Sequence, residues 1–139
     1  MTPTLLGRWE TRLLLLATVG VIVAVVVGLL VKNFAVPFAV LGYVFLFGLV
    51  WDVLYQATIN YRWDRDWPTF FQVLAGIVEG ALVWFLAHDG LLPGVDRTKL
   101  PFGVFIGMYA TIWVITFMIA QGPLRLFLVR WRYQGGEVV

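Results

Sequence analysis

Two acidic residues lie inside long apolar stretches of the sequence, where a carboxylate is costly and therefore informative. Glu79 lies near the middle of the apolar segment 69–88, and Asp52 lies in the later part of the apolar segment 34–58. A charge at the bilayer centre costs at least about 2.5 to 3.5 kcal/mol, so such a group is protonated or faces water or a partner. Movement of protons or small cations is the chemistry that these positions indicate.

Glutamine side chains extend these two carboxylates into a candidate polar path. On a helix, Gln56 shares a face with Asp52, and Gln72 shares a face with Glu79. If the two segments pack antiparallel, Gln72 reaches the depth of Asp52, and Gln121 can join them from the end of the last apolar segment. We therefore expect an ion path that is entered near Asp52, from the cytoplasmic side, and has Glu79 as its deep titrating or cation-binding group.

A purely structural role for both acidic residues stays open. Asp52 can pair with Arg12, Arg62 or another arginine at the membrane interface. Glu79 can accept a hydrogen bond from a neighbouring Tyr, Thr or Trp side chain. In that case the carboxylates fix the packing of the helices and transport nothing.

The residue types that are missing exclude most catalytic chemistry. The chain has no Cys and no Ser, and its single His is His88. Ser–His–Asp and Cys–His arrangements are therefore impossible within one chain, and Cys-based metal sites are excluded. Two carboxylates alone do not define a metal site. We expect no enzymatic activity, no cofactor and no bound metal.

The composition is that of a membrane protein. Of the 139 residues, 61% are hydrophobic and 13% are charged, whereas soluble domains carry about 25% charged residues. The apolar segments 13–31, 34–58, 69–88 and 101–120 are long enough to cross a hydrocarbon core of about 30 Å. The sequence thus predicts one all-α domain, residues 1–139, with four transmembrane helices in an up-down bundle and an interfacial C-terminal tail, residues 121–139.

The distribution of basic residues predicts the orientation in the membrane. With four crossings, the side that holds both termini and the middle loop carries seven arginines: Arg8, Arg12, Arg62, Arg65, Arg125, Arg130 and Arg132. The opposite side carries three basic residues, Lys32, Arg97 and Lys99. Because the more basic side faces the cytoplasm, we expect both termini there. We expect a bacterial inner or internal membrane.

The middle loop and the tail are candidate contact surfaces for lipid or for a membrane-protein partner. Both combine arginine with tryptophan or other large apolar residues, a pattern typical of the membrane interface. The candidate contact residues are Arg62, Trp63, Arg65, Trp67, Arg125, Arg130 and Arg132. A salt-bridged turn that only joins two helices explains the loop equally well.

Two pairs of glycines have the spacing that lets membrane helices approach closely. Gly76 and Gly80 form one pair, and Gly103 and Gly107 form the other. This spacing serves packing inside one bundle or contact between subunits. Because a bundle of four helices has little interior volume, we expect a homo-oligomer. The net charge of +2 gives no reason to expect a nucleic-acid partner.

Two classes of function remain from the sequence. The first is an oligomeric proton or small-cation channel or transporter that uses an intramembrane carboxylate. The alternative is a non-catalytic accessory, assembly or lipid-organising subunit of a larger membrane complex.

Overall fold

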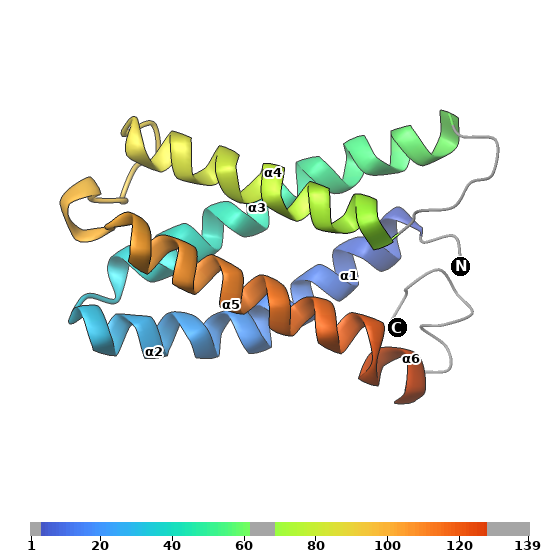
Figure 1. The fold of residues 1–139 in the computed structure, drawn as a ribbon, viewed down its shortest axis with the longest axis horizontal. Coiled ribbons are helices and arrows are strands. Elements are labelled where there is room, and N and C mark those ends of the chain that lie inside the picture. Colours follow the sequence, from blue (N-terminus) through green and yellow to red (C-terminus); the bar gives the residue numbers. More distant parts are fainter. Residues whose placement is uncertain (1–3, 62–68, 128–139) are drawn as a thin grey trace.

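The computed structural model describes residues 4–61 and 69–127, and the regular structure of this part is entirely helical (Figure 1). The elements, in chain order, are α1 (Leu5–Leu15), the π-helical turn η1 (Leu16–Gly20), α2 (Val21–Val31), α3 (Ala35–Tyr61), α4 (Thr69–His88), the 3₁₀ turn η2 (Arg97–Lys99), α5 (Phe102–Gln121) and α6 (Pro123–Phe127).

Four helices of the described part are long and apolar enough to cross a membrane, as the sequence predicts. They are Leu5–Val31, Ala35–Tyr61, Thr69–His88 and Phe102–Gln121. The first contains α1, η1 and α2 without a break. It begins at Leu5, whereas the uncharged segment predicted from the sequence begins at Leu13. Arg8 and Arg12 therefore belong to the helix and do not precede it. This difference decides what the candidate site contains.

Local signals fix the ends of the first helix. Thr4 caps its beginning, since the Thr4 hydroxyl accepts a hydrogen bond from the Gly7 amide at 3.1 Å. Lys32 ends it in the left-handed conformation, with φ of 54°. The Asn33 side chain then accepts a hydrogen bond from the Val36 amide at 3.3 Å and so begins α3.

The π-helical turn divides the first helix into two halves with different neighbours. Within it, the Thr18 hydroxyl donates a hydrogen bond to the Leu14 carbonyl at 2.7 Å. A π-helical turn holds more residues than an α-helical turn and so shifts the faces of the residues that follow. The half before the turn, α1, packs on α3, and the half after it, α2, packs on both α3 and α5.

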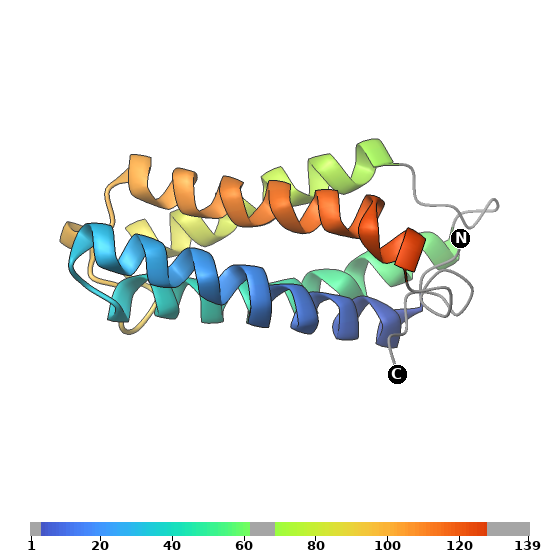
Figure 2. The ribbon, with the colours of Figure 1, turned by 90° about the horizontal axis from the view of Figure 1, so that it is seen from below.

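The two ends of the bundle hold different elements. The α2–α3 and α4–α5 connections lie at one end, and the start of α1 and α6 lie at the opposite end (Figure 1). Turned by 90°, the bundle shows α5 running over the layer that α1, α2 and α3 form (Figure 2). Apolar side chains such as Val40, Val83 and Phe105 fill the first end and are almost fully buried. Other apolar residues, for example Leu30, are exposed on the outside of the bundle, as is typical of helices that are apolar enough to cross a membrane.

A buried ion cluster in the membrane region

Arg12 lies between the two acidic residues and contacts both. Its Nε donates a hydrogen bond to Asp52 Oδ2 at 2.8 Å, and its Nη1 donates one to Glu79 Oε1 at 2.9 Å. The three side chains come from α1, α3 and α4. One guanidinium therefore joins three of the four membrane-length helices.

The two carboxylates hold Arg12 unequally. Asp52 receives a second hydrogen bond, from Arg12 Nη2 to Oδ1 at 3.2 Å, so Arg12 and Asp52 form a bidentate pair. Glu79 receives a single hydrogen bond from Arg12. A second arginine also approaches Asp52, with 3.9 Å between Arg8 Nη1 and Asp52 Oδ1. Asp52 is thus the more firmly bound acid of the two.

We call Arg8, Arg12, Asp52 and Glu79 the ion cluster. Its two arginines balance its two carboxylates, so the formal charge of the group is zero when all four are ionised. Asp52 and Glu79 are each only 5% exposed. Such burial is tolerated because the charges are paired and hydrogen-bonded to one another.

Gly48 makes room for the Arg12 guanidinium on the surface of α3. It lies one helical turn before Asp52, and a Cβ at this position would overlap the guanidinium. The absence of a side chain at residue 48 therefore lets Arg12 cross α3 and reach both acids. Close approach of this kind is a common reason for glycine within a membrane helix.

The glycine pair of α4 serves packing inside the bundle. A Cβ on Gly76 would overlap the indole of Trp113, and a Cβ on Gly80 would contact the ring of Tyr109. The Tyr109 hydroxyl donates a hydrogen bond to the Gly76 carbonyl at 2.7 Å. Through these contacts α5 packs closely on α4 beside Glu79, and so covers the ion cluster on that side.

The glutamines of the expected path lie in two places. Gln121 Nε2 donates a hydrogen bond to Gln72 Oε1 at 3.0 Å. The start of α4 and the end of α5 therefore meet, as expected from the positions of the two glutamines in their apolar segments. Gln56 lies on α3 one turn after Asp52, and its buried Oε1 has no hydrogen-bond partner among the described residues. Its unsatisfied oxygen is the kind of group that a buried water satisfies.

Most of the expected contact residues lie outside the described part of the chain. These are Arg62, Trp63, Arg65, Trp67, Arg130 and Arg132. Arg125 lies on the short helix α6. The structure therefore describes the carboxylate pair in full and leaves the loop and tail hypothesis as a prediction.

The arginines of the first helix are the part of the site that the sequence prediction misses. The sequence suggests Arg12 as a partner of Asp52 but not of Glu79, and suggests Arg8 only as a determinant of orientation. A helical continuation of the apolar segment backwards from Leu13 puts both arginines on one face, four residues apart. That spacing, opposite two carboxylates on later helices, is the signal that identifies the ion cluster.

Within residues 4–61 and 69–127, no group of three or more His, Cys, Asp or Glu side chains comes together. The two carboxylates that do come together are occupied by Arg12.

Comparison with known proteins gave no match: no protein-family model, no curated protein and no solved structure is significantly similar to this chain.

Proposed function

We propose that this chain is a small oligomeric membrane protein that moves protons across the bilayer, with Glu79 as the group that accepts and releases them. The observation that carries this proposal is the unequal sharing of Arg12 between Asp52 and Glu79. Asp52 holds the guanidinium through two hydrogen bonds and Glu79 through one.

This inequality gives Glu79 freedom that Asp52 lacks. When Glu79 takes up a proton and lets go of Arg12, the guanidinium keeps its bidentate partner Asp52 and is not left unpaired. A buried arginine with no partner is strongly destabilising. The cluster thus has two arrangements of the kind that a transport cycle needs, one with Glu79 bound to Arg12 and one with Glu79 protonated.

The charges favour a proton over a metal cation as the transported species. A metal ion bound by Glu79 and Asp52 would lie next to Arg12 and close to Arg8, and like charges at short range repel strongly in a medium of low dielectric constant. A proton neutralises Glu79 without occupying a site of its own. In this proposal Asp52 is the anchor of Arg12 and also lies nearest the side from which the proton enters.

Flux measurements in proteoliposomes test the proposal. The purified chain is reconstituted with a pH-sensitive dye inside the vesicles, and the decay of an imposed pH gradient is compared with that of Glu79→Gln. The amide cannot titrate but can still accept a hydrogen bond from Arg12. Asp96→Asn, a change at an exposed carboxylate in the α4–α5 connection, is the matched control.

We expect the native chain and Asp96→Asn to dissipate the gradient and Glu79→Gln to lose most of this activity. Equal rates for the native chain and Glu79→Gln, or no flux above that of empty vesicles in either, would overturn the proposal. Thermal unfolding of each variant in detergent shows whether a loss of flux is a loss of fold.

A second candidate function is that of an accessory subunit in a larger membrane complex. One observation favours it: the ion cluster is charge-balanced and joins α1, α3 and α4 without any added ion. In this role the cluster only holds the bundle together, and outer surfaces contact lipid or a partner. Glu79→Gln would then reduce stability and leave vesicle permeability unchanged.

The orientation is part of the proposal and has its own test. The sequence distribution of basic residues, seven beside the termini and the middle loop against three on the opposite side, supports cytoplasmic termini, as expected for a bacterial inner or internal membrane. Because the chain contains no cysteine, single cysteines at Thr4 and Lys99 report the two ends separately. A membrane-impermeant maleimide added to intact cells is expected to label position 99 and to spare position 4.

A further inference from the structure

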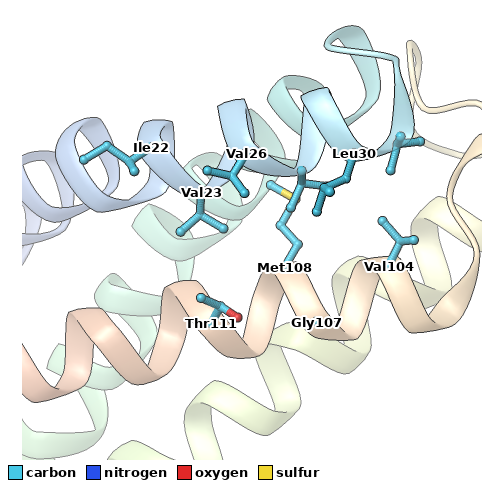
Figure 3. A pocket seen from close by; sticks show the side chains of 10 residues that line it. Ile22, Val23, Val26, Leu30, Val104, Gly107, Met108 and Thr111 are labelled. Atoms are coloured by element: carbon cyan, nitrogen blue, oxygen red, sulfur yellow. The ribbon is translucent and has the colours of Figure 1, made fainter.

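A groove between α2 and α5 lies on the outside of the bundle, away from the ion cluster. It has a volume of about 500 Å³ and, apart from Thr111, an apolar lining (Figure 3). On the α2 side, Ile22, Val26 and Leu30 form its exposed rim. On the α5 side, Met108 is buried. Since both helices are membrane-length spans, the groove opens toward the hydrocarbon of the bilayer.

The groove has the length of an acyl chain in one leaflet. From Ile22 to Leu30 it follows α2 for about 12 Å, at 1.5 Å per residue. Half of a hydrocarbon core of about 30 Å is close to this length. The groove therefore runs from near the membrane surface to near the midplane and does not cross the whole bilayer.

A cation lies at the outer end of the groove. Lys32 directly follows the lining residue Val31, and its side chain is exposed. Within residues 4–61 and 69–127, Lys32 is the one residue other than glycine that has a positive φ. This position favours Gly or Asn, and Asn33 follows immediately. The backbone conformation at this position therefore does not explain the choice of lysine, which lies at the end of a membrane-length helix, where lipid headgroups are expected.

We propose that the α2–α5 groove binds one acyl chain of an anionic phospholipid whose phosphate contacts Lys32. The apolar lining accepts the chain, the length of the groove matches one leaflet, and Lys32 supplies the charge that selects an anionic headgroup. A basic residue near the membrane surface contributes enough attraction to favour anionic over zwitterionic lipid about fivefold. This site does not depend on the proposed proton transport.

Glycines of α5 allow a sharp steric test. A Cβ on Gly107 would have nothing within 4 Å, and Gly107 lines the groove. Gly107→Leu therefore fills the groove without a clash inside the bundle. Gly103 is equally open but does not line the groove, so Gly103→Leu is the matched control.

Lipid binding is measured by native mass spectrometry of the detergent-solubilised chain, with phosphatidylglycerol and phosphatidylcholine of identical acyl chains. We expect the native chain to bind phosphatidylglycerol about fivefold more tightly. Lys32→Gln is expected to abolish this preference, and Lys99→Gln, at a lysine already paired with Asp96 at 3.5 Å, to preserve it. Gly107→Leu is expected to weaken binding of both lipids, and Gly103→Leu to leave it unchanged.

Three results would each overturn the proposal. The first is equal binding of the two lipids by the native chain. The second is lipid binding by Gly107→Leu at the native level. The third is a change from oligomer to monomer in Gly107→Leu while lipid binding stays intact, because the groove would then be a contact between copies of the chain.

Discussion

Gly48 and Arg12 lie against each other so closely that the guanidinium of Arg12 occupies the space of the side chain that Gly48 lacks. This contact links the sequence of α3 to the geometry of the ion cluster. Any side chain at residue 48 must move Arg12 away from Asp52, Glu79 or both.

Gly48→Ala is therefore expected to destabilise the protein by about 1 to 3 kcal/mol, the usual cost of overpacking a tight interior. Gly42→Ala, on the same helix, is the control, since a Cβ at Gly42 meets nothing within 4 Å. Unfolding of both variants by SDS from mixed micelles gives the comparison. Equal stability of the two variants would show that Arg12 does not need the space at Gly48.

Removal of Arg12 alone is expected to be more harmful than removal of Arg12 together with the two acids that it contacts. Arg12→Met leaves two buried carboxylates without their shared cation, and loss of one partner of a buried pair costs about 3 to 5 kcal/mol. The triple variant Arg12→Met, Asp52→Asn, Glu79→Gln removes these three charges together and leaves Arg8 in place. It is expected to regain at least half of the loss in the same unfolding assay. A triple variant less stable than the single one would mean that the pairing is not what holds these helices together.

Two tyrosine hydrogen bonds to backbone carbonyls provide a matched pair. Tyr109 donates to Gly76 in a partly buried position at 2.7 Å, and Tyr43 donates to Pro93 in an exposed position at 2.8 Å. Tyr109→Phe is expected to lower the free energy of unfolding by about 1 to 2 kcal/mol. The partly buried carbonyl of Gly76 loses its hydrogen bond, and water replaces this bond less readily there than at an exposed site. Tyr43→Phe is expected to cost no more than about 0.6 kcal/mol. A larger loss for Tyr43→Phe in thermal unfolding would contradict this order.

The two glycine pairs are expected to respond in opposite ways to alanine. At Gly76 and Gly80 the new methyl group meets Trp113 or Tyr109, so each substitution is expected to destabilise by about 1 to 3 kcal/mol. At Gly103 a Cβ has open space, so Gly103→Ala is expected to stay within about 1 kcal/mol and to lie on the stabilising side. The same unfolding assay ranks these variants, and tolerance at Gly76 would contradict the packing described for α4 and α5.

The connection between α4 and α5 is expected to loosen in acid. A side-chain and a backbone hydrogen bond from Thr98 hold the pKa of the exposed Asp96 carboxyl below its ordinary value. Because the folded pKa is the lower one, this turn is stabilised above the unfolded value of about 3.9 and loses that support as the pH falls through the folded value. The protection of the Thr98 amide against hydrogen exchange, expressed relative to the intrinsic exchange rate at each pH, should therefore fall over this range. In Asp96→Asn this pH-dependent loss of protection should be absent, and its persistence there would assign it to another group.

The membrane-length helices follow directly from sequence, because the length and hydropathy of an apolar segment depend on no other part of the chain. The composition of the ion cluster does not follow in this way. Charged residues look like the end of an apolar segment, so the sequence pattern predicts a first helix that begins only after Arg8 and Arg12. The backbone continues through them because arginine is a good helix former, and because Asp52 and Glu79 are positioned to receive Arg12.

The use of the glycines also depends on the partners that surround them. Gly76 and Gly103 begin pairs with identical spacing, so spacing alone cannot tell an inward face from an outward one. The difference arises from Trp113 and Tyr109, whose rings fill the space beside the first pair and leave the second pair open. By contrast, the meeting of Gln72 and Gln121 follows from the depth of the two helix ends, which the sequence does define.

The ion cluster has a consequence for the order in which the protein is assembled. Arg12 is separated from Asp52 by 40 residues and from Glu79 by 67. During synthesis the first helix reaches the membrane before either acid has left the ribosome. Until then its arginines are expected to extend toward the lipid headgroups, as basic side chains near helix ends do. The first helix can therefore take its final position only after the third span has been inserted, because that span supplies the last residue of the ion cluster.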